Sequence, residues 1–223
     1  MLPATSQTCV PRAPSRHQGA NPSSKNAKLS VNKIGVIGMK QPSLETTRVI
    51  LRPLHADDAA RIQSLVNHPA IADMTAQIPY PYPQGLAASW ISTQTNNWAK
   101  GTGVVYGVVL KEENTLIGVV SVQKLNTGLP ELGYWLGTEY WGKGYATEAA
   151  RCLCEFAFRR LDTMCIFACH LTRNSSSGNV LKKLGFCCLG STEERVKKSQ
   201  KIEMISNYIL KIDSLKGAHP LRF

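Results

Sequence analysis

The chain has 223 residues and a mass of 24.5 kDa, a length that suits one domain with an additional segment. Its apolar fraction of 43% is sufficient to form a substantial core, which excludes disorder along the whole chain. No apolar run approaches the ~20 residues that a membrane-spanning helix needs, so a spanning protein is also excluded.

The net charge of +11 is concentrated near the N-terminus, where six basic residues precede the first acidic residue, Glu45. A strongly basic chain is compatible with nucleic acid, a membrane surface or an anionic ligand. Six of the eleven net charges therefore lie in this segment, and the rest of the chain carries only about +5. Nucleic-acid binding by a basic module remains an alternative function, although the chain lacks a recognised nucleic-acid-binding motif. We expect neither a membrane nor a nucleic acid as the main partner.

Residues 1–43 are rich in Pro, Ser, Asn and basic residues and show no helical periodicity. This composition is typical of disorder or of a targeting extension such as an organelle transit peptide. We predict a basic tail over 1–43, a folded domain over 44–213 and a C-terminal tail over 214–223. The seven cysteines include no C-x-x-C pair, which favours a reduced, cytoplasmic protein, with an organelle as the alternative location.

Strands dominate the first half of the folded part, and a glycine-containing loop leads into its longest predicted helix. Because several neighbouring strands precede that loop, the order favours an α/β or α+β fold with a sheet of mixed strand direction. A doubly wound fold would alternate strand and helix from the start. The predicted strands are 48–54, 104–110, 116–123, 131–136, 165–171 and 202–210, and the predicted helices end at 66, 98, 160 and 184.

Gly142 and Gly144 lie between the strand at 131–136 and the following helix. Glycines allow the backbone to approach a ligand closely, and a helix N-terminus offers unpaired N–H groups and a positive dipole end. These features, together with Lys143, suit a phosphate group. A Walker loop is absent, and a dinucleotide fingerprint fails because Asp162 precedes the next strand instead of ending it.

The loop and its neighbours resemble the GNAT acetyltransferases, especially the RimJ/RimL-like branch. The resemblance covers residues 44 to 212, and its blocks follow the order of the family. These blocks are Arg48–Leu54 with Leu116–Gly118, then Glu131–Leu136 with Trp141–Ala149, then Asn174–Ser177, and finally Val180–Phe186. One departure is Glu139, which stands where the family usually has Arg or Gln, and we expect its carboxylate to point away from the loop.

The resemblance implies the acyl-CoA N-acyltransferase fold, an α+β fold of three layers. Its central, mostly antiparallel mixed sheet splays open between the strands at 131–136 and 165–171, and helices flank it. Acetyl-CoA would enter the split as co-substrate. Its pantetheine arm would pair along Leu136 and bond Asn174, and its pyrophosphate would meet the loop. The implied pyrophosphate contacts are Gly142, Lys143, Gly144, Tyr145, Ala146 and Thr147.

Two residues are candidates for proton transfer. An amine attacks a thioester only when neutral, so a base must remove its proton, and we expect Glu131 at the open end of the split to do so. Ser177 lies where the family places a hydroxyl near the CoA sulfur. The alternative for Glu131 is an exposed carboxylate at the start of a strand, and the alternative for Ser177 is the N-cap of the following helix. We expect no metal, because Cys165 and Cys169 share a strand face that His170 does not.

The predicted function is transfer of the acetyl group of acetyl-CoA to a primary amine by direct attack in a ternary complex. The acceptor would be a protein N-terminus or a small amine. The alternative within the same fold is a CoA-binding protein that has lost catalysis. We expect a monomer or a homodimer.

Overall fold

A computed structural model describes residues 40–196 and 198–214 of the chain. The chain divides into two units, Met1–Asn32 and Lys33–Phe223, and all of the described residues belong to the second unit. The predicted tails at 1–43 and 214–223 therefore lie outside the described residues, except for residues 40–43 and Ser214.

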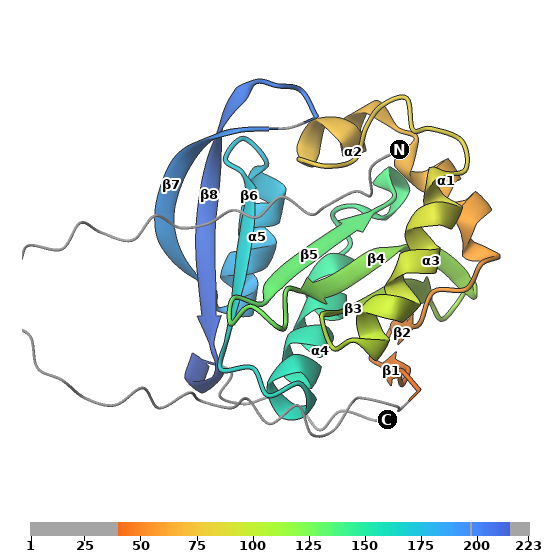
Figure 1. Cartoon of the computed structure of the whole chain (residues 1–223), viewed down its shortest axis with the longest axis horizontal. Coiled ribbons are helices and arrows are strands. Elements are labelled where there is room, and N and C mark those ends of the chain that lie inside the picture. Colours follow the sequence, from red (N-terminus) through yellow and green to blue (C-terminus); the bar gives the residue numbers. More distant parts are fainter. Residues whose placement is uncertain (1–39, 197, 215–223) are drawn as a thin grey trace, which may run out of the picture. The chain divides into compact units, whose positions relative to one another are not determined.

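A single sheet of eight strands organises the described residues, in the order β1-β2-β3-β4-β5-β6-β8-β7 (Figure 1). All neighbouring strands are antiparallel except β5 and β6, which run parallel. The sheet is thus mixed and mostly antiparallel, as the sequence predicts. Its strands are β1 Leu44–Glu45, β2 Val49–Arg52, β3 Gly103–Leu110, β4 Thr115–Gln123, β5 Glu131–Leu136, β6 Cys165–Leu171, β7 Cys187–Arg195 and β8 Ile202–Lys211.

Helices cover both faces of this sheet and make three layers. Helices α1 and α3 pack on one face, here called the front, and α4 and α5 pack on the opposite back face. Two short 3-10 turns, η1 Thr138–Tyr140 and η2 Ile212–Ser214, follow β5 and β8. The α-helices are α1 Asp58–Val66, α2 Pro69–Met74, α3 Leu86–Ala99, α4 Tyr145–Arg160 and α5 Ser175–Leu184.

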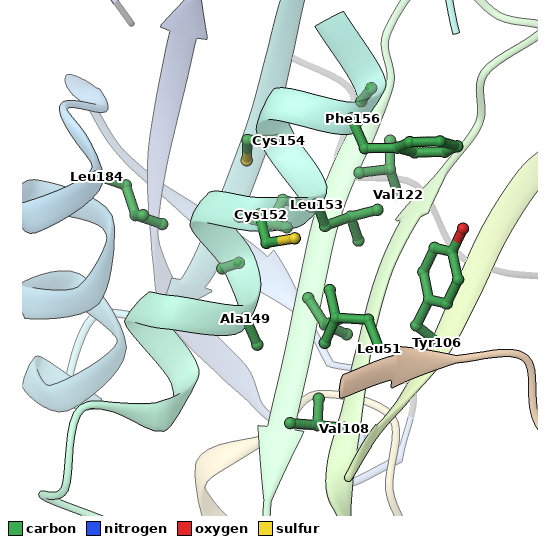
Figure 2. Packing of buried hydrophobic residues seen from close by; sticks show 14 of the residues in the cluster. Leu51, Tyr106, Val108, Val122, Ala149, Cys152, Leu153, Cys154, Phe156 and Leu184 are labelled. Atoms are coloured by element: carbon green, nitrogen blue, oxygen red, sulfur yellow. The ribbon is translucent and has the colours of Figure 1, made fainter. Parts of the chain in front are cut away.

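The larger core lies between α4 and the back face of the sheet. Figure 2 shows Leu153 and Phe156 of α4 on the side of the helix that faces Leu51, Tyr106 and Val122 of the strands. Leu153 and Leu51 are fully buried, and the rings of Phe156 and Tyr106 meet edge to face at 6.2 Å. Burial of such side chains contributes about 1.5–3 kcal/mol each, so α4 is held firmly at the back of the sheet.

A smaller core lies beneath α1 and α3 at the front. It joins Ile62 and Val66 of α1 to Ile91 of α3 and to Val105 and Val119 of β3 and β4. Strand residues alternate between the faces, so these odd-numbered valines face the front while Val104, Val108 and Val120 face α4. The front helices therefore cover the half of the sheet that contains β3 and β4.

Three helices or strands were not predicted, and the smallest is the two-residue strand β1. Helix α2 was not predicted, although Pro69 at its first position and His68 as its N-cap are typical start signals. The imidazole Nδ1 of His68 accepts a hydrogen bond from Ala70 N at 3.2 Å. Strand β7 was also missed, because its largely exposed residues leave no buried face to produce an alternating pattern.

Candidate functional site

The loop between β5 and α4 has the backbone shape that the sequence predicts for an anion site. Gly142 and Gly144 both have positive φ, at +75° and +84°, and Gly144 is the N-cap of α4. Since glycine carries no side chain to cap the helix, the first N–H groups of α4 are left for another acceptor. Gly142, Lys143 and Gly144 are exposed, and Tyr145, Ala146 and Thr147 are half-buried.

Glu139 does not face this loop. Its side chain is 55% exposed and pairs with Arg61 of α1 at 3.5 Å, which agrees with the expected outward direction. Arg61 also donates to the hydroxyl of Tyr140 at 3.0 Å and to the carbonyl of Leu116 at 3.0 Å. Glu139, which departs from the family pattern, thus pairs with Arg61 of the front helix α1 and does not face the glycine loop.

Strands β5 and β6 separate soon after they meet. Their register pairs only Glu131 with Phe167 and Leu132 with Ala168. Beyond these residues β5 continues along β4 to Leu136, while β6 continues along β8 to Leu171. The sheet therefore opens between the two strands towards their C-terminal ends, which confirms the predicted split.

The position of Glu131 corrects one expectation. Glu131 lies at the closed end of the split, where β5 and β6 pair, and not at its open end, because parallel strands that diverge towards their C-termini meet at their N-terminal ends. One carboxylate oxygen accepts from the ammonium of Lys124, and the other lies 3.7 Å from the thiol sulfur of Cys169. Lys124 has φ +60°, a sparsely populated conformation that persists only when its surroundings favour it.

Leu136 ends β5 and borders the open part of the split. It pairs with Gly118 of β4, and its carbonyl accepts the indole N–H of Trp141 at 2.8 Å. A pantetheine arm that pairs along this strand would therefore compete with Trp141 for that carbonyl. Trp141, itself 43% exposed, joins the end of β5 to the glycine loop.

Asn174 and Ser177 lie at the start of α5, on the back of the sheet. Asn174 is the N-cap, and its side-chain oxygen accepts from Ser177 N at 3.1 Å. Ser177 is therefore not the N-cap, which corrects that alternative, because α5 begins at Ser175. The Asn174 amide donates to Met74 O at 3.0 Å, so its side chain bonds protein groups at both ends.

Tyr134 of β5 fixes the position of Ser177. Its hydroxyl donates to the backbone carbonyl of Ser177 at 3.0 Å. Burial raises the pKa of the Tyr134 hydroxyl well above its usual value. The first turn of α5 is thereby held against the strand that borders the split.

Helix α2 is tied to the far side of the split. Arg173 joins Asp73 of α2, at 2.9 Å, to Glu203 of β8, at 3.2 Å. The ammonium of Lys198, from the β7–β8 hairpin, donates to the carbonyls of Ala72 and Thr75. Burial lowers the pKa of this ammonium below its usual value. Since α2 follows α1 directly along the chain, it connects the front helices to the strands beyond the split.

The comparisons with known proteins agree with this geometry. A family model described as an acetyltransferase (GNAT) domain matches residues 48–187. The uncharacterized N-acetyltransferase p20 of Bacillus licheniformis is 27% identical over 146 residues, which cover 65% of this chain and 82% of the relative.

Two solved structures share the fold. The RimL ribosomal L7/L12 α-N-protein acetyltransferase in complex with coenzyme A has a TM-score of 0.69 at 18% identity, and the match covers 78% of this chain and 99% of that chain. The ribosomal-protein-S5-alanine acetyltransferase from Vibrio fischeri has a TM-score of 0.67 at 23% identity and covers 79% and 100%.

The split sheet and the glycine loop define an acyl-CoA-dependent acyltransferase. The chain belongs to the GNAT family of N-acetyltransferases, and its acetyl donor is acetyl-CoA. The loop has room for this donor at Gly142, because apart from its two chain neighbours no described residue lies within 4 Å of a Cβ built there. Among the described residues, no group of His, Cys, Asp and Glu has the arrangement of a metal site, and no helix is long and apolar enough to cross a membrane.

Sequence reasoning missed several side chains around the site. Arg48 and Glu148 form a contact beside the glycine loop, and Lys124 and Cys169 contact Glu131. In the sequence Arg48 and Glu148 are only members of matching blocks, and Lys124 is a polar residue after a strand. Arg48 and Glu148, and likewise Cys169 and Glu131, join segments that are distant in sequence and meet only in the folded sheet. Lys124 and Glu131 face each other across the short β4–β5 connection, where the strand pattern does not show which side chains pair.

Proposed function

We propose that the protein transfers the acetyl group of acetyl-CoA to the α-amine of a protein or peptide. The observation that carries this proposal is the front of β6 and β8, which within the described residues lies outside the front core and is only half-buried. The front core includes residues of β3 and β4 but, within the described part of the chain, none from β6 or β8. Phe167 and Cys169 of β6, with Asn207 and Ile209 of β8, are half-buried there and lead to Glu131.

An extended chain suits this surface better than a compact small amine. It would run along the front of β6 and β8 and bring its first residue to the closed end of the split. An α-amine also suits the chemistry, since its pKa of about 7.7–8.0 leaves more of it neutral at pH 7 than a lysine. In support, two solved proteins of this fold are named as ribosomal-protein acetyltransferases.

The donor would approach from the back of the sheet. The N–H groups of Gly142 to Thr147 would receive the pyrophosphate, and Lys143 would add a positive charge beside it. The pantetheine arm would follow Leu136 into the split. Because the Asn174 side chain already bonds Ser177 and Met74, we infer that Asn174 acts by holding α5 and α2 and not by a free amide.

The proposed transfer needs two proton movements. The neutral amine forms a bond to the thioester carbon, and Glu131 accepts the proton that the amine releases. The C–S bond then breaks, and the Ser177 hydroxyl donates to the departing thiolate. That thiolate needs little assistance, since the pKa of a thiol is already about 8.5. Lys124 holds the Glu131 carboxylate in place through its ion pair.

The test is release of CoA thiol from acetyl-CoA in the presence of a panel of acceptors. The panel contains peptides with a free N-terminus, the same peptides blocked at the N-terminus but containing lysine, and small amines of similar basicity. The proposal expects turnover with the free peptides and little with the blocked ones. Equal turnover with small amines would assign the protein to small-molecule acetylation, and no turnover with any acceptor would favour a CoA-binding protein that lacks catalysis.

A further inference from the structure

Arg48 joins the N-terminal part of the domain to the glycine loop. Its backbone N–H donates to one oxygen of Glu148 at 2.8 Å, and its Nε donates to the other at 2.7 Å. Its Nη1 donates to the backbone carbonyl of Lys143 at 2.9 Å. The guanidinium also lies 4.6 Å from the centre of the Tyr145 ring, so this one side chain contacts the loop and the first turn of α4.

The contact with Lys143 determines where the next N–H group points. In a planar trans peptide, the C=O of one residue and the N–H of the next point in opposite directions. Because Arg48 holds the Lys143 carbonyl, the N–H of Gly144 is directed away from Arg48. Gly144 is the N-cap of α4, so this N–H belongs to the group of donors that would receive an anion.

The contact with Glu148 removes a competitor from the same site. A carboxylate in the first turn of a helix is attracted to the positive end of the helix, where it would oppose a bound phosphate. Here both carboxylate oxygens are engaged by Arg48, and Thr46 donates to one of them at 2.6 Å. Burial alone would raise the pKa of Glu148, but these hydrogen bonds hold it below its usual value.

We propose that Arg48 is a positioning residue for acetyl-CoA binding, which orients the Lys143–Gly144 peptide and holds the Glu148 carboxylate away from the anion. This inference rests on the proposed binding of the pyrophosphate at the glycine loop. Arg48 acts through the loop backbone and through Glu148, so its loss affects the affinity for the donor and not the chemical step.

The experiment measures the Kd of CoA by calorimetry and the kinetics of thiol release for Arg48→Ala, Arg48→Lys and a control. Arg48→Ala is expected to raise the Kd and the KM for acetyl-CoA about 10- to 100-fold, the usual range for loss of hydrogen bonds to a charged group. The kcat at saturating donor stays near wild type. Arg48→Lys restores part of the affinity, because it keeps the charge but not the forked geometry.

Lys111→Ala is the matched control. It removes an ion pair of the same N-terminal segment, between Lys111 and Glu45 at 3.0 Å, and leaves the loop contacts in place. Its Kd for CoA is expected to equal that of the wild type. An equal loss of affinity in Lys111→Ala, or an unchanged Kd in a folded Arg48→Ala, would overturn the inference.

Glu148→Gln separates positioning from direct binding of the anion by Arg48. If Arg48 contacts the phosphates itself, removal of its paired carboxylate frees the guanidinium and tightens CoA binding in the otherwise wild-type chain, and the same change gives no recovery in Arg48→Ala. If Arg48 acts by holding Glu148 away from the anion, Glu148→Gln changes the Kd of the otherwise wild-type chain little and restores part of the affinity lost in Arg48→Ala. Tighter binding in the single variant, with no recovery in the double variant, therefore overturns the inference. Gly142→Val tests the loop without contacting Arg48, because apart from the chain neighbours no described residue lies within 4 Å of a Cβ built there. It therefore distinguishes failure of the positioning role from failure of the proposed loop function.

Discussion

Glu131 and Tyr134 belong to the same strand but serve opposite faces of the sheet. Glu131 contacts Lys124 and Cys169 at the front, whereas the Tyr134 hydroxyl donates to the Ser177 carbonyl on the back. The alternation of β5 thus separates the two proposed proton transfers. Glu131, the proposed base, lies on the front, where we propose that the amine arrives. Ser177, the proposed proton donor to the CoA thiolate, lies on the back, on the same side as the glycine loop.

The first prediction concerns Glu131. Glu131→Gln keeps the shape of the side chain and removes the proton acceptor, so turnover should fall by ~10²–10⁴. The KM for acetyl-CoA should change little, because this residue lies on the front face. The loss should shrink at high pH, where more of the acceptor amine is already neutral. Steady-state kinetics from about pH 6 to 9.5 provide the measurement, with the range chosen around the α-amine pKa.

Lys124→Met is the control for this variant. It breaks the same ion pair but leaves the carboxylate, so it reports the structural effect of losing the contact. We expect a smaller loss of turnover that does not depend on the protonation of the amine. Wild-type rates for Glu131→Gln at pH 7 would contradict the role of base and leave Glu131 as a structural partner of Lys124.

The second prediction concerns Ser177. Ser177→Ala removes the hydroxyl but keeps the backbone N–H and carbonyl that bond Asn174 and Tyr134. Turnover should fall by less than in Glu131→Gln, because a thiolate with a pKa of about 8.5 departs readily. Comparison of the two pH–rate profiles checks this ranking, and a larger loss for Ser177→Ala than for Glu131→Gln would reverse the assignment.

The third prediction concerns the glycine loop. Gly144→Val should abolish detectable CoA binding in calorimetric titration while the fold persists, because a side chain at φ +84° strains the turn and obstructs approach of the anion. Gly85→Val is the matched control. Gly85 is the left-handed N-cap of α3 at φ +78°, so a valine there is strained by a similar amount, about 1–3 kcal/mol. Gly85 does not belong to the glycine loop. Equal CoA affinity in both variants would remove the anion-site argument.

Local patterns predicted most of the fold. Strands β5 and β6 have the predicted bounds, since their apolar residues lie between clear turn signals. The glycine loop was predicted for a similar reason, because its chemistry resides in consecutive residues. Side-chain pairs were not predicted: Arg48 meets Glu148 across a hundred residues, and the ties of α2 to Arg173 and Lys198 arise from the folded sheet. Whether Glu131 lies at the open or the closed end of the split depends on the relative direction of β5 and β6, which a local sequence pattern does not specify.

The fourth prediction concerns the N-terminal boundary. Deletion of residues 1–39, which lie outside the described residues, should leave the thermal midpoint and the turnover nearly unchanged. Extension of the deletion to residue 43 removes Gln41, whose amide donates to Val105 O at 2.8 Å, and should cost about 1 kcal/mol of stability. Thermal unfolding of both truncated chains provides the measurement. A large loss in the shorter deletion would show that the tail packs on the domain.

The fifth prediction concerns stability in acid. Both oxygens of the buried Asp58 carboxylate accept from Arg52, at 2.7 and 2.8 Å, and one also accepts from His55 N at 2.7 Å. Burial alone would raise the pKa of Asp58, but these hydrogen bonds hold it below its usual value. The carboxylate therefore stabilises the fold above the ordinary pKa of about 3.9, and this contribution is lost as the pH falls from there through the folded-state pKa.

Asp58→Asn should consequently lower the free energy of unfolding at pH 7 by about 2–4 kcal/mol, because it leaves the partly buried Arg52 without its counter-ion. The difference from wild type should shrink as the pH falls below about 4, where the wild type also loses the pair. Asp57→Asn makes the same change of charge at the neighbouring exposed N-cap, which forms no side-chain cap hydrogen bond, and should have little effect. Urea unfolding of the three proteins at pH 7, 5 and 3 measures these differences. Equal destabilisation by the two substitutions at pH 7 would show that net charge, and not the Arg52–Asp58 pair, controls the response to acid.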